Sequence, residues 1–201
     1  MRIFFSFFFI LLVCAPTNGA TLLILGDSLS AGYNMPIAQS WPTLLDGQLN
    51  HKGKPITVIN ASTSGDTTGN GLAKLPALLA QYKPTTVLIE LGANDGLRGF
   101  SIQTVSANIA QIITLSKAQN SQVILMQIQI PPNYGKRYTQ AFRSLYPKLS
   151  EQYGVPLVPF FLEPLMLQKP QWIMNDGLHP TVQAQPWIAQ FMAKTLSPYL
   201  D

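Results

Sequence analysis

Five short apolar runs alternate along the chain with longer segments in which apolar residues recur with a helical period. The runs are nearly continuous in valine, isoleucine, leucine and phenylalanine, and they cover residues 21–25, 56–59, 87–91, 123–130 and 155–161. Strands with this composition are buried on both faces, as in a parallel sheet covered by helices. The segments between them predict helices over residues 41–49, 72–81, 102–117, 141–153 and 184–196. Because strands and helices alternate throughout, we expect one α/β domain: a three-layer α/β/α sandwich with a five-stranded parallel sheet.

The first twenty residues do not follow this pattern. Arg2 precedes an apolar run over residues 3–13, and small, turn-prone residues follow over 16–20. This layout predicts a secretory signal peptide over residues 1–20 and a mature domain over 21–201, located in the periplasm or secreted. The alternative is a membrane anchor, but the run is far shorter than the roughly 20 apolar residues that span a bilayer. Cleavage would remove Cys14, the single cysteine, and with it any thiolate chemistry.

Composition excludes several classes of function. Hydrophobic residues make up 47% of the chain and charged residues 11%, so the chain can bury a substantial core. The net charge of +4 comes from scattered cations without a basic stripe, which argues against nucleic-acid binding. Two distant histidines without a second cysteine cannot form a usual zinc site, and no glycine-rich phosphate loop is present. We therefore expect a small-molecule substrate, no metal, no cofactor and a monomer.

Small polar clusters follow three of the predicted strands. They cover residues 26–30, 60–67 and 92–96. Open α/β sheets bind ligands at the carboxyl ends of their strands, where such clusters can meet. Turns favour glycine and serine in any case, but three successive clusters at one edge predict a site there.

His179 is the candidate general base. His51 lies in a hydrophilic turn before the second strand, which is typical of a solvated residue. Asp176 stands three residues before His179, close enough for its carboxylate to hold one imidazole nitrogen while the other takes a proton. The alternative is an aspartate that only starts the terminal helix, beside an incidental histidine.

Ser28 is the candidate nucleophile, because it follows the first strand directly. The Gly-x-Ser-x-Gly elbow of ordinary α/β-hydrolases is absent, since Ser30 stands where the second glycine would be. Gly65 and Asn94 could donate hydrogen bonds to an oxyanion, through a backbone N–H and a side-chain amide respectively. Each residue also has a purely structural interpretation: Ser28 as a helix cap, Gly65 as a turn residue, Asn94 as an Asx-turn.

Four blocks together resemble the SGNH, or GDSL-type, hydrolases: Gly-Asp-Ser-Leu at 26–29, Gly65, Gly-Ala-Asn-Asp at 92–95 and Asp-Gly-Leu-His at 176–179. The resemblance covers essentially the whole mature chain. It implies that Ser28 is the nucleophile, that His179 is its base held by Asp176, and that the oxyanion hole comprises Ser28, Gly65 and Asn94. It also implies a mobile loop over residues 96–100 beside the acyl site. One departure is Ala93, where relatives carry a glycine.

The expected activity is hydrolysis of acyl esters and thioesters through an acyl-enzyme. Four apolar or amphipathic residues near the predicted loops could form an acyl groove, although they could equally be core or rim residues: Leu97, Phe100, Ile130 and Tyr134. A carbohydrate acetylesterase of the same family is the alternative among enzymes. The alternative from another class is a lipid- or glycan-binding module without catalysis.

Overall fold

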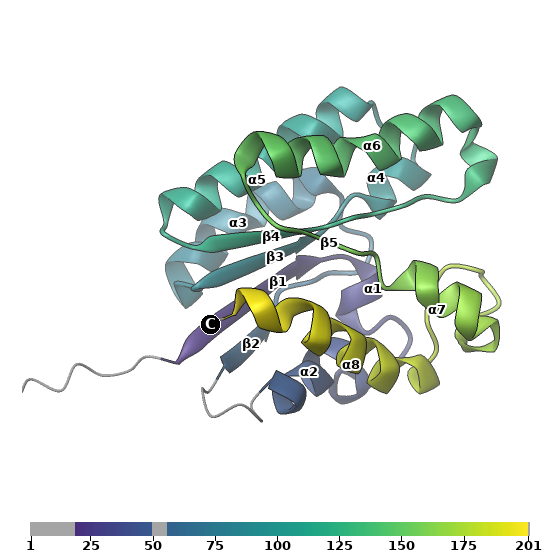
Figure 1. Ribbon diagram of the computed structural model, residues 1–201, viewed down its shortest axis with the longest axis horizontal. Helices are drawn as coiled ribbons and strands as arrows, with labels where there is room; N and C mark the ends of the chain where they lie inside the picture. Colours follow the sequence, from purple (N-terminus) through teal and green to yellow (C-terminus); the bar gives the residue numbers. More distant parts are fainter. Residues whose placement is uncertain (1–18, 50–55, 201) are drawn as a thin grey trace, which may run out of the picture.

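A five-stranded parallel sheet forms the centre of the protein. The computed structural model describes residues 19–49 and 56–200. The strands are β1 (Ala20–Gly26), β2 (Ile56–Asn60), β3 (Thr86–Glu90), β4 (Gln122–Met126) and β5 (Leu157–Val158). Their order is β2-β1-β3-β4-β5 and every pairing is parallel (Figure 1). From β1 the chain passes to β2 on one side, and it then crosses back over β1 to form β3 on the other side. The direction of winding therefore reverses between β1 and β3, which is where open sheets of this order bind ligands.

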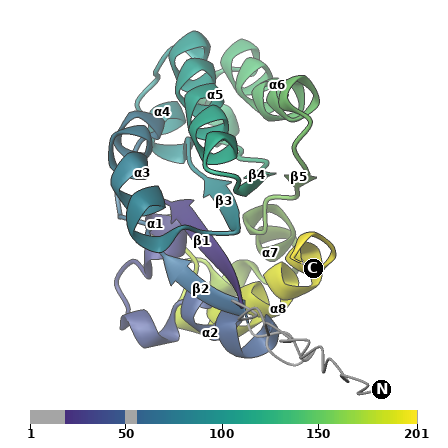
Figure 2. The ribbon, with the colours of Figure 1, turned by 90° about the vertical axis from the view of Figure 1, so that its left-hand side faces the viewer.

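Helices cover both faces of the sheet. The helices α3 (Thr68–Tyr82), α5 (Ile102–Ala118) and α6 (Lys136–Tyr153) pack on one face, and α2 (Trp41–Leu49) and α8 (Gln185–Leu196) pack against each other on the other (Figure 2). The central strands are buried on both faces: residues 22–25 of β1 and 87–89 of β3 are inaccessible to solvent. The predicted three-layer α/β/α sandwich is therefore confirmed. In the described part of the chain, no helix is both long and apolar enough to span a bilayer.

Two strands are shorter than their apolar runs predict. The fourth run continues to residue 130, but β4 ends at Met126, and the fifth run covers 155–161, whereas β5 has only two residues. Ile128 and Phe161 lie beyond these ends and are still fully buried. Apolar character therefore reflects burial here, and not pairing in the sheet. The segment after β4 instead lines the cavity described below.

Three short helices were not predicted: α1 (Ser28–Ala31), α4 (Ala93–Leu97) and α7 (Leu162–Gln168). With four to seven residues, each is too short to show a helical period. The helices α1 and α4 follow β1 and β3 directly and occupy segments expected to be loops. Single-turn 3₁₀ helices complete the connections: η1 (Ile37–Gln39), η3 (Pro132–Tyr134), η4 (Pro170–Trp172), η5 (Val182–Ala184) and η6 (Ser197–Tyr199). The predicted signal peptide, apart from residues 19 and 20, and the predicted solvated His51 lie outside the described residues.

Candidate active site

Ser28, His179 and Asp176 form a continuous hydrogen-bonded chain. The imidazole Nε2 of His179 lies 2.8 Å from Ser28 Oγ, and its Nδ1 lies 2.7 Å from Asp176 Oδ2. The serine begins α1 at the end of β1, whereas the histidine lies 151 residues later, before α8. The structure thus brings together the three residues that the sequence predicts to act as nucleophile, base and orienting acid.

A short loop holds His179 against its aspartate. Asp176 Oδ1 accepts hydrogen bonds from the backbone N–H groups of Leu178 (2.9 Å) and His179 (3.0 Å). Partial burial raises the pKa of Asp176, but these bonds and the contact with the His179 ring outweigh burial, and the net pKa is below its ordinary value. The loop closes through an antiparallel bridge between Ile173 and Pro180. Asp176 is therefore an ionised partner of the imidazole and does not start a helix.

Tyr33 stacks on the imidazole ring of His179. The ring centroids are 4.1 Å apart and the planes differ by 26°. Tyr33 comes from the segment directly after α1, the helix that Ser28 begins. It could not be predicted from the sequence, because a tyrosine five residues after the serine carries no signal of its own. It belongs to the site by contact.

Two buried acids fix the turn that presents Ser28. Glu90, at the end of β3, accepts hydrogen bonds through Oε2 from Ser30 Oγ (2.7 Å) and from the N–H of Asp27 (3.4 Å). Asp27 Oδ1 accepts from the N–H of Leu29 (3.0 Å) and thereby caps α1. Burial raises the pKa of Glu90 well above its ordinary value, and the negative charge of Asp27 adds to this. Ser28 itself is therefore not the cap, which leaves its hydroxyl free for His179.

The pKa of Asp27 is raised as well. Burial raises its pKa to about 7, although hydrogen bonds from Leu29 and Asn94 act in the opposite direction. Two acids packed against each other without a cation are tolerable only when at least one of them is protonated. The turn that carries Ser28 is therefore held by hydrogen bonds.

The three candidate oxyanion donors lie together. Asn94 Nδ2 donates to Asp27 Oδ2 (3.3 Å) and to the backbone oxygen of Asp66 (3.0 Å), so its amide bridges the residue before Ser28 and the residue after Gly65. Gly65 has φ 85° and occupies the third position of a turn closed by the bond from Asp66 N–H to the Thr63 carbonyl. Glycine is needed there because a side chain would be strained. Among the described residues, neither the Ser28 N–H nor the Gly65 N–H has a hydrogen-bond partner.

A small cavity opens beside Ser28. It has a volume of about 70 Å³ and is lined by Ser28, Asn94, His179 and mostly apolar side chains. A larger apolar groove of about 360 Å³ shares much of its wall, namely Gln129, Ile130, Pro131, Phe160, Leu162 and Leu178, and extends to α7. Three of these six, Gln129, Ile130 and Phe160, lie where the apolar runs continue beyond β4 and β5. The polar groups of the site, Ser28, Asn94 and His179, therefore lie at one end of an otherwise apolar cavity and groove.

Of the four residues expected to form an acyl groove, the structure places two at the cavity. Leu97 and Ile130 line it. Phe100 and Tyr134 lie further out and are more than one-third exposed; the Tyr134 hydroxyl donates to the Leu97 carbonyl (2.9 Å). Leu162 and Leu178 line both cavities and were missed. Only the position of Leu178 next to His179 could have indicated it.

Comparison with known proteins identifies the family. The sequence profile of the GDSL-like Lipase/Acylhydrolase family matches residues 24–185. An arylesterase of Vibrio mimicus is 56% identical over 192 residues, which are 96% of each chain. Thioesterase 1/protease 1/lysophospholipase L1 of Escherichia coli is 52% identical over 194 residues, covering 96% of this chain and 91% of that protein.

A solved structure agrees with this. The psychrotrophic esterase EstA from Pseudoalteromonas sp., in a structure inhibited by monoethylphosphonate, is 44% identical with a TM-score of 0.86, covering 90% of this chain and 98% of that chain. The resemblance expected from the four sequence blocks is thereby confirmed. The chain belongs to the GDSL-like lipase/acylhydrolase family, and it is a serine esterase or thioesterase.

Proposed function

We propose that Ser28 is the nucleophile of a two-step acyl transfer. In the first step, Ser28 Oγ attacks the acyl carbonyl carbon while His179 Nε2 takes the hydroxyl proton. The tetrahedral intermediate collapses, His179 protonates the leaving alkoxide or thiolate, and the acyl group stays on Ser28. In the second step, His179 takes a proton from water and the hydroxide attacks the acyl-enzyme carbonyl. The bond to Ser28 Oγ then breaks while His179 returns the proton to that oxygen, and the carboxylic acid leaves. Asp176 fixes the imidazole and stabilises its charged form throughout.

The oxyanion of both intermediates would be held by three donors. They are the backbone N–H groups of Ser28 and Gly65 and the side-chain amide of Asn94. Donors fixed in advance lower the barrier because they need no reorganisation when the charge forms. The bond to the Asp66 carbonyl (3.0 Å) positions the Asn94 amide, and its second hydrogen, which bonds to Asp27 at 3.3 Å, would pass to the oxyanion. The turn that carries Gly65 is tied to α4 by Arg98, whose Nη2 donates to the Gly65 carbonyl (3.1 Å).

We infer that the substrates carry acyl chains of medium or greater length. The main support is the size of the apolar groove into which the cavity at Ser28 continues: about 360 Å³, roughly five times the 70 Å³ of the cavity itself. An acetyl group would leave this groove empty, whereas a longer chain would bury its methylenes there at about 0.8 kcal/mol each. The activities named for the relatives, a thioesterase and lysophospholipase among them, agree with a long acyl donor.

A panel of esters and thioesters of graded acyl length, from acetyl to palmitoyl, tests both parts of the proposal. Ser28→Ala should lose roughly three orders of magnitude or more in kcat on every substrate. Unchanged melting of this variant would show that the loss is chemical. Hydrolysis that survives at the wild-type rate would end the assignment of Ser28. A preference for acetyl esters in the wild type would favour the carbohydrate acetylesterase instead.

A substitution in the groove tests whether acyl chains bind there. Met166 lines the groove but not the small cavity, and its side chain is exposed enough to accept a larger residue. Met166→Trp should lower kcat/KM for long acyl chains and leave acetyl ester hydrolysis within about twofold, because only the outer part of the channel is blocked. An equal loss for all lengths would show that acyl chains do not enter this groove.

We further propose that the protein is exported and that its mature domain begins near Thr21. This rests on the sequence of residues 1–20, with Arg2, an apolar run and a small-residue end. Edman sequencing of the protein recovered from a periplasmic or extracellular fraction should give an N-terminus near residue 20. An intact Met1 in that fraction would contradict cleavage.

A further inference from the structure

Exposed apolar side chains gather where the groove meets solvent. Leu167 is 79% exposed and Met166 is 42% exposed, and both lie on α7 at the groove wall. Pro132, at the start of η3, also lines the groove, and the exposed Tyr134 ends that helix. We call Phe100, Pro132, Tyr134, Met166 and Leu167 the apolar rim. Of the eight exposed large apolar side chains in the described residues, four belong to this rim, and such a cluster is typical of an interaction surface.

The rim is continuous across three elements. Tyr134 is bonded through its hydroxyl to the Leu97 carbonyl, and the Tyr138 hydroxyl donates to the Phe100 carbonyl (2.7 Å). The segment 97–100 is therefore held beside η3 and the start of α6, and η3 and α7 both line the groove. The elements concerned all follow the carboxyl ends of β3, β4 and β5, so the rim faces away from the sheet at the edge that carries the active site (Figure 1).

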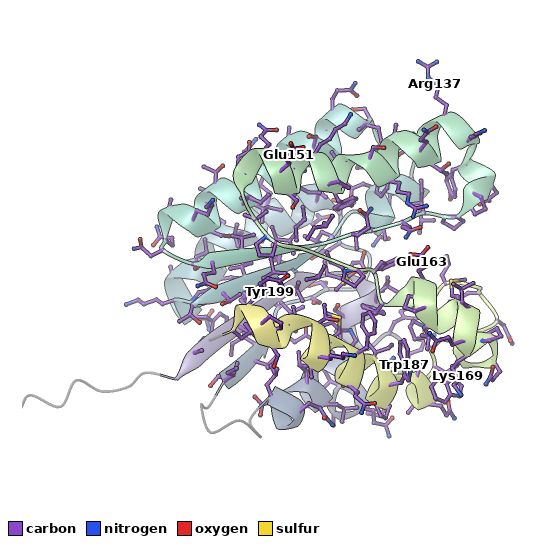
Figure 3. The ribbon with its side chains drawn as sticks, viewed as in Figure 1. Arg137, Glu151, Glu163, Lys169, Trp187 and Tyr199 are labelled. Atoms are coloured by element: carbon purple, nitrogen blue, oxygen red, sulfur yellow. The ribbon has the colours of Figure 1, made fainter. Side chains whose placement is uncertain are left out.

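Cations surround the rim. Arg98 precedes Phe100 by two residues, Lys136 and Arg137 begin α6 directly after η3, and Lys169 follows α7. Within the part of the chain that the structure describes, none of the four lies within 4.0 Å of a carboxylate. One exposed acid, Glu163, stands among them and accepts a bond from Gln129 Nε2 (2.7 Å). Figure 3 shows Arg137 and Lys169 at the two ends of this edge, with Glu163 between them.

We propose that the apolar rim docks on the surface of an anionic phospholipid bilayer. Apolar side chains that enter the boundary between headgroups and acyl chains gain free energy by leaving water, and each nearby lysine or arginine adds attraction to the anionic headgroups. The groove opens inside the docked face, so an acyl chain could pass from the bilayer to Ser28 without crossing water. The passage of an acyl chain from the bilayer to Ser28 rests on the proposed function, whereas docking on the bilayer does not.

A second copy of the chain fits the apolar rim less well than an anionic bilayer does. In a two-fold symmetric dimer the same patch meets itself. The four cations would then face four others across the interface, and the exposed acids Glu163 and Asp176 would offset only part of this charge, which opposes association. An anionic surface complements both the apolar and the charged part of the patch.

Vesicle flotation tests the proposal without catalysis. The Ser28→Ala protein is mixed with vesicles of phosphatidylglycerol and phosphatidylcholine in equal parts, or of phosphatidylcholine alone, and the bound fraction is measured. We expect binding to the anionic vesicles, at least about tenfold weaker binding to the neutral ones, and loss of most of this difference at about 0.5 M salt. Failure of the proposed function would appear as wild-type protein that binds but does not hydrolyse esters.

Paired variants separate the rim from the rest of the surface. Leu167→Asp and the double variant Lys136→Glu/Arg137→Glu should each weaken anionic vesicle binding by about tenfold or more. Leu115→Asp and the double variant Lys148→Glu/Lys194→Glu are the matched controls, since these exposed residues lie toward the other ends of α5, α6 and α8, and they should bind within about twofold of the parent. Melting curves of all four variants verify folding. Absence of flotation, equal binding to both vesicle types, or equal loss in rim and control variants would overturn the proposal.

Discussion

Gly92 should tolerate no side chain, and the reason lies in one tyrosine. Gly92 ends the strand-to-helix turn before Asn94 and has φ 122°, a conformation that other residues rarely adopt. A Cβ added there would collide with the hydroxyl of Tyr146. That hydroxyl is fully buried and donates to the Leu91 carbonyl at 3.0 Å. Gly92→Ala therefore adds backbone strain and a steric overlap, and the overlap involves a single oxygen atom.

The magnitudes separate the two effects. Backbone strain of this kind costs about 1–3 kcal/mol, and overpacking in a dense interior costs a further 1–3 kcal/mol or so. Tyr146→Phe removes the colliding oxygen and one buried hydrogen bond, which costs about 1–2 kcal/mol alone. After its removal, the nearest remaining atoms to the new Cβ are at 3.4 Å and 3.5 Å, which is ordinary contact. The double variant should therefore be more stable than the sum of the single variants predicts, by about 1–3 kcal/mol.

Urea unfolding of the wild type, both single variants and the double variant provides the cycle, with m-values compared to verify two-state behaviour. Ester hydrolysis measured on the same four proteins should fall most in Gly92→Ala, because Asn94 is two residues away on the displaced turn. Free energies that add to within about 0.5 kcal/mol would refute the steric argument. The cost would then lie in the backbone alone.

Further predictions concern the donor, the base and the buried acids. Asn94→Ala should lower kcat about 100-fold with little change in KM, measured by steady-state kinetics, because the donor acts on the transition state. Tyr33→Leu should lower kcat/KM about 2- to 10-fold across the pH profile, whereas Tyr33→Phe keeps the stack on His179 and should stay within about twofold. Folding raises the pKa of Asp27 from 3.8 to about 7, so the folded state binds this proton more tightly and stability falls as pH rises between these values. Asp27→Asn should flatten that slope in urea unfolding at about pH 5 and pH 8; an unchanged slope would contradict a raised pKa.

The sheet could be predicted from the sequence because buried parallel strands leave an unmistakable apolar signature. The ends of β4 and β5 could not, since Ile128 and Phe161 are as apolar as strand residues and fully buried, but lie outside the strands. The short helices α1 and α4 have too few residues for any period to emerge. The hydrophobicity of a segment indicates how deeply it is buried, but it does not indicate which segment it hydrogen-bonds to.

The site was predictable to the extent that its chemistry is rare in the sequence. Two histidines and a nearby aspartate restricted the base almost to His179 before any geometry was known. Tyr33 and Leu178 could not be found in this way, because stacking and cavity lining depend on how remote segments meet. Glu90 was missed for the same reason: it reads as the last residue of a strand, and only its bonds to Ser30 and Asp27 show its part in the site.

The bond between Ser28 and His179 also bears on biosynthesis. One partner is among the first residues of the domain to leave the ribosome, while the other arrives with the segment that leads into the terminal helix. A nascent or truncated chain that ends before residue 179 holds Ser28, the two buried acids and all five strands, but lacks His179. The enzyme should accordingly become active only when synthesis of the domain is nearly complete.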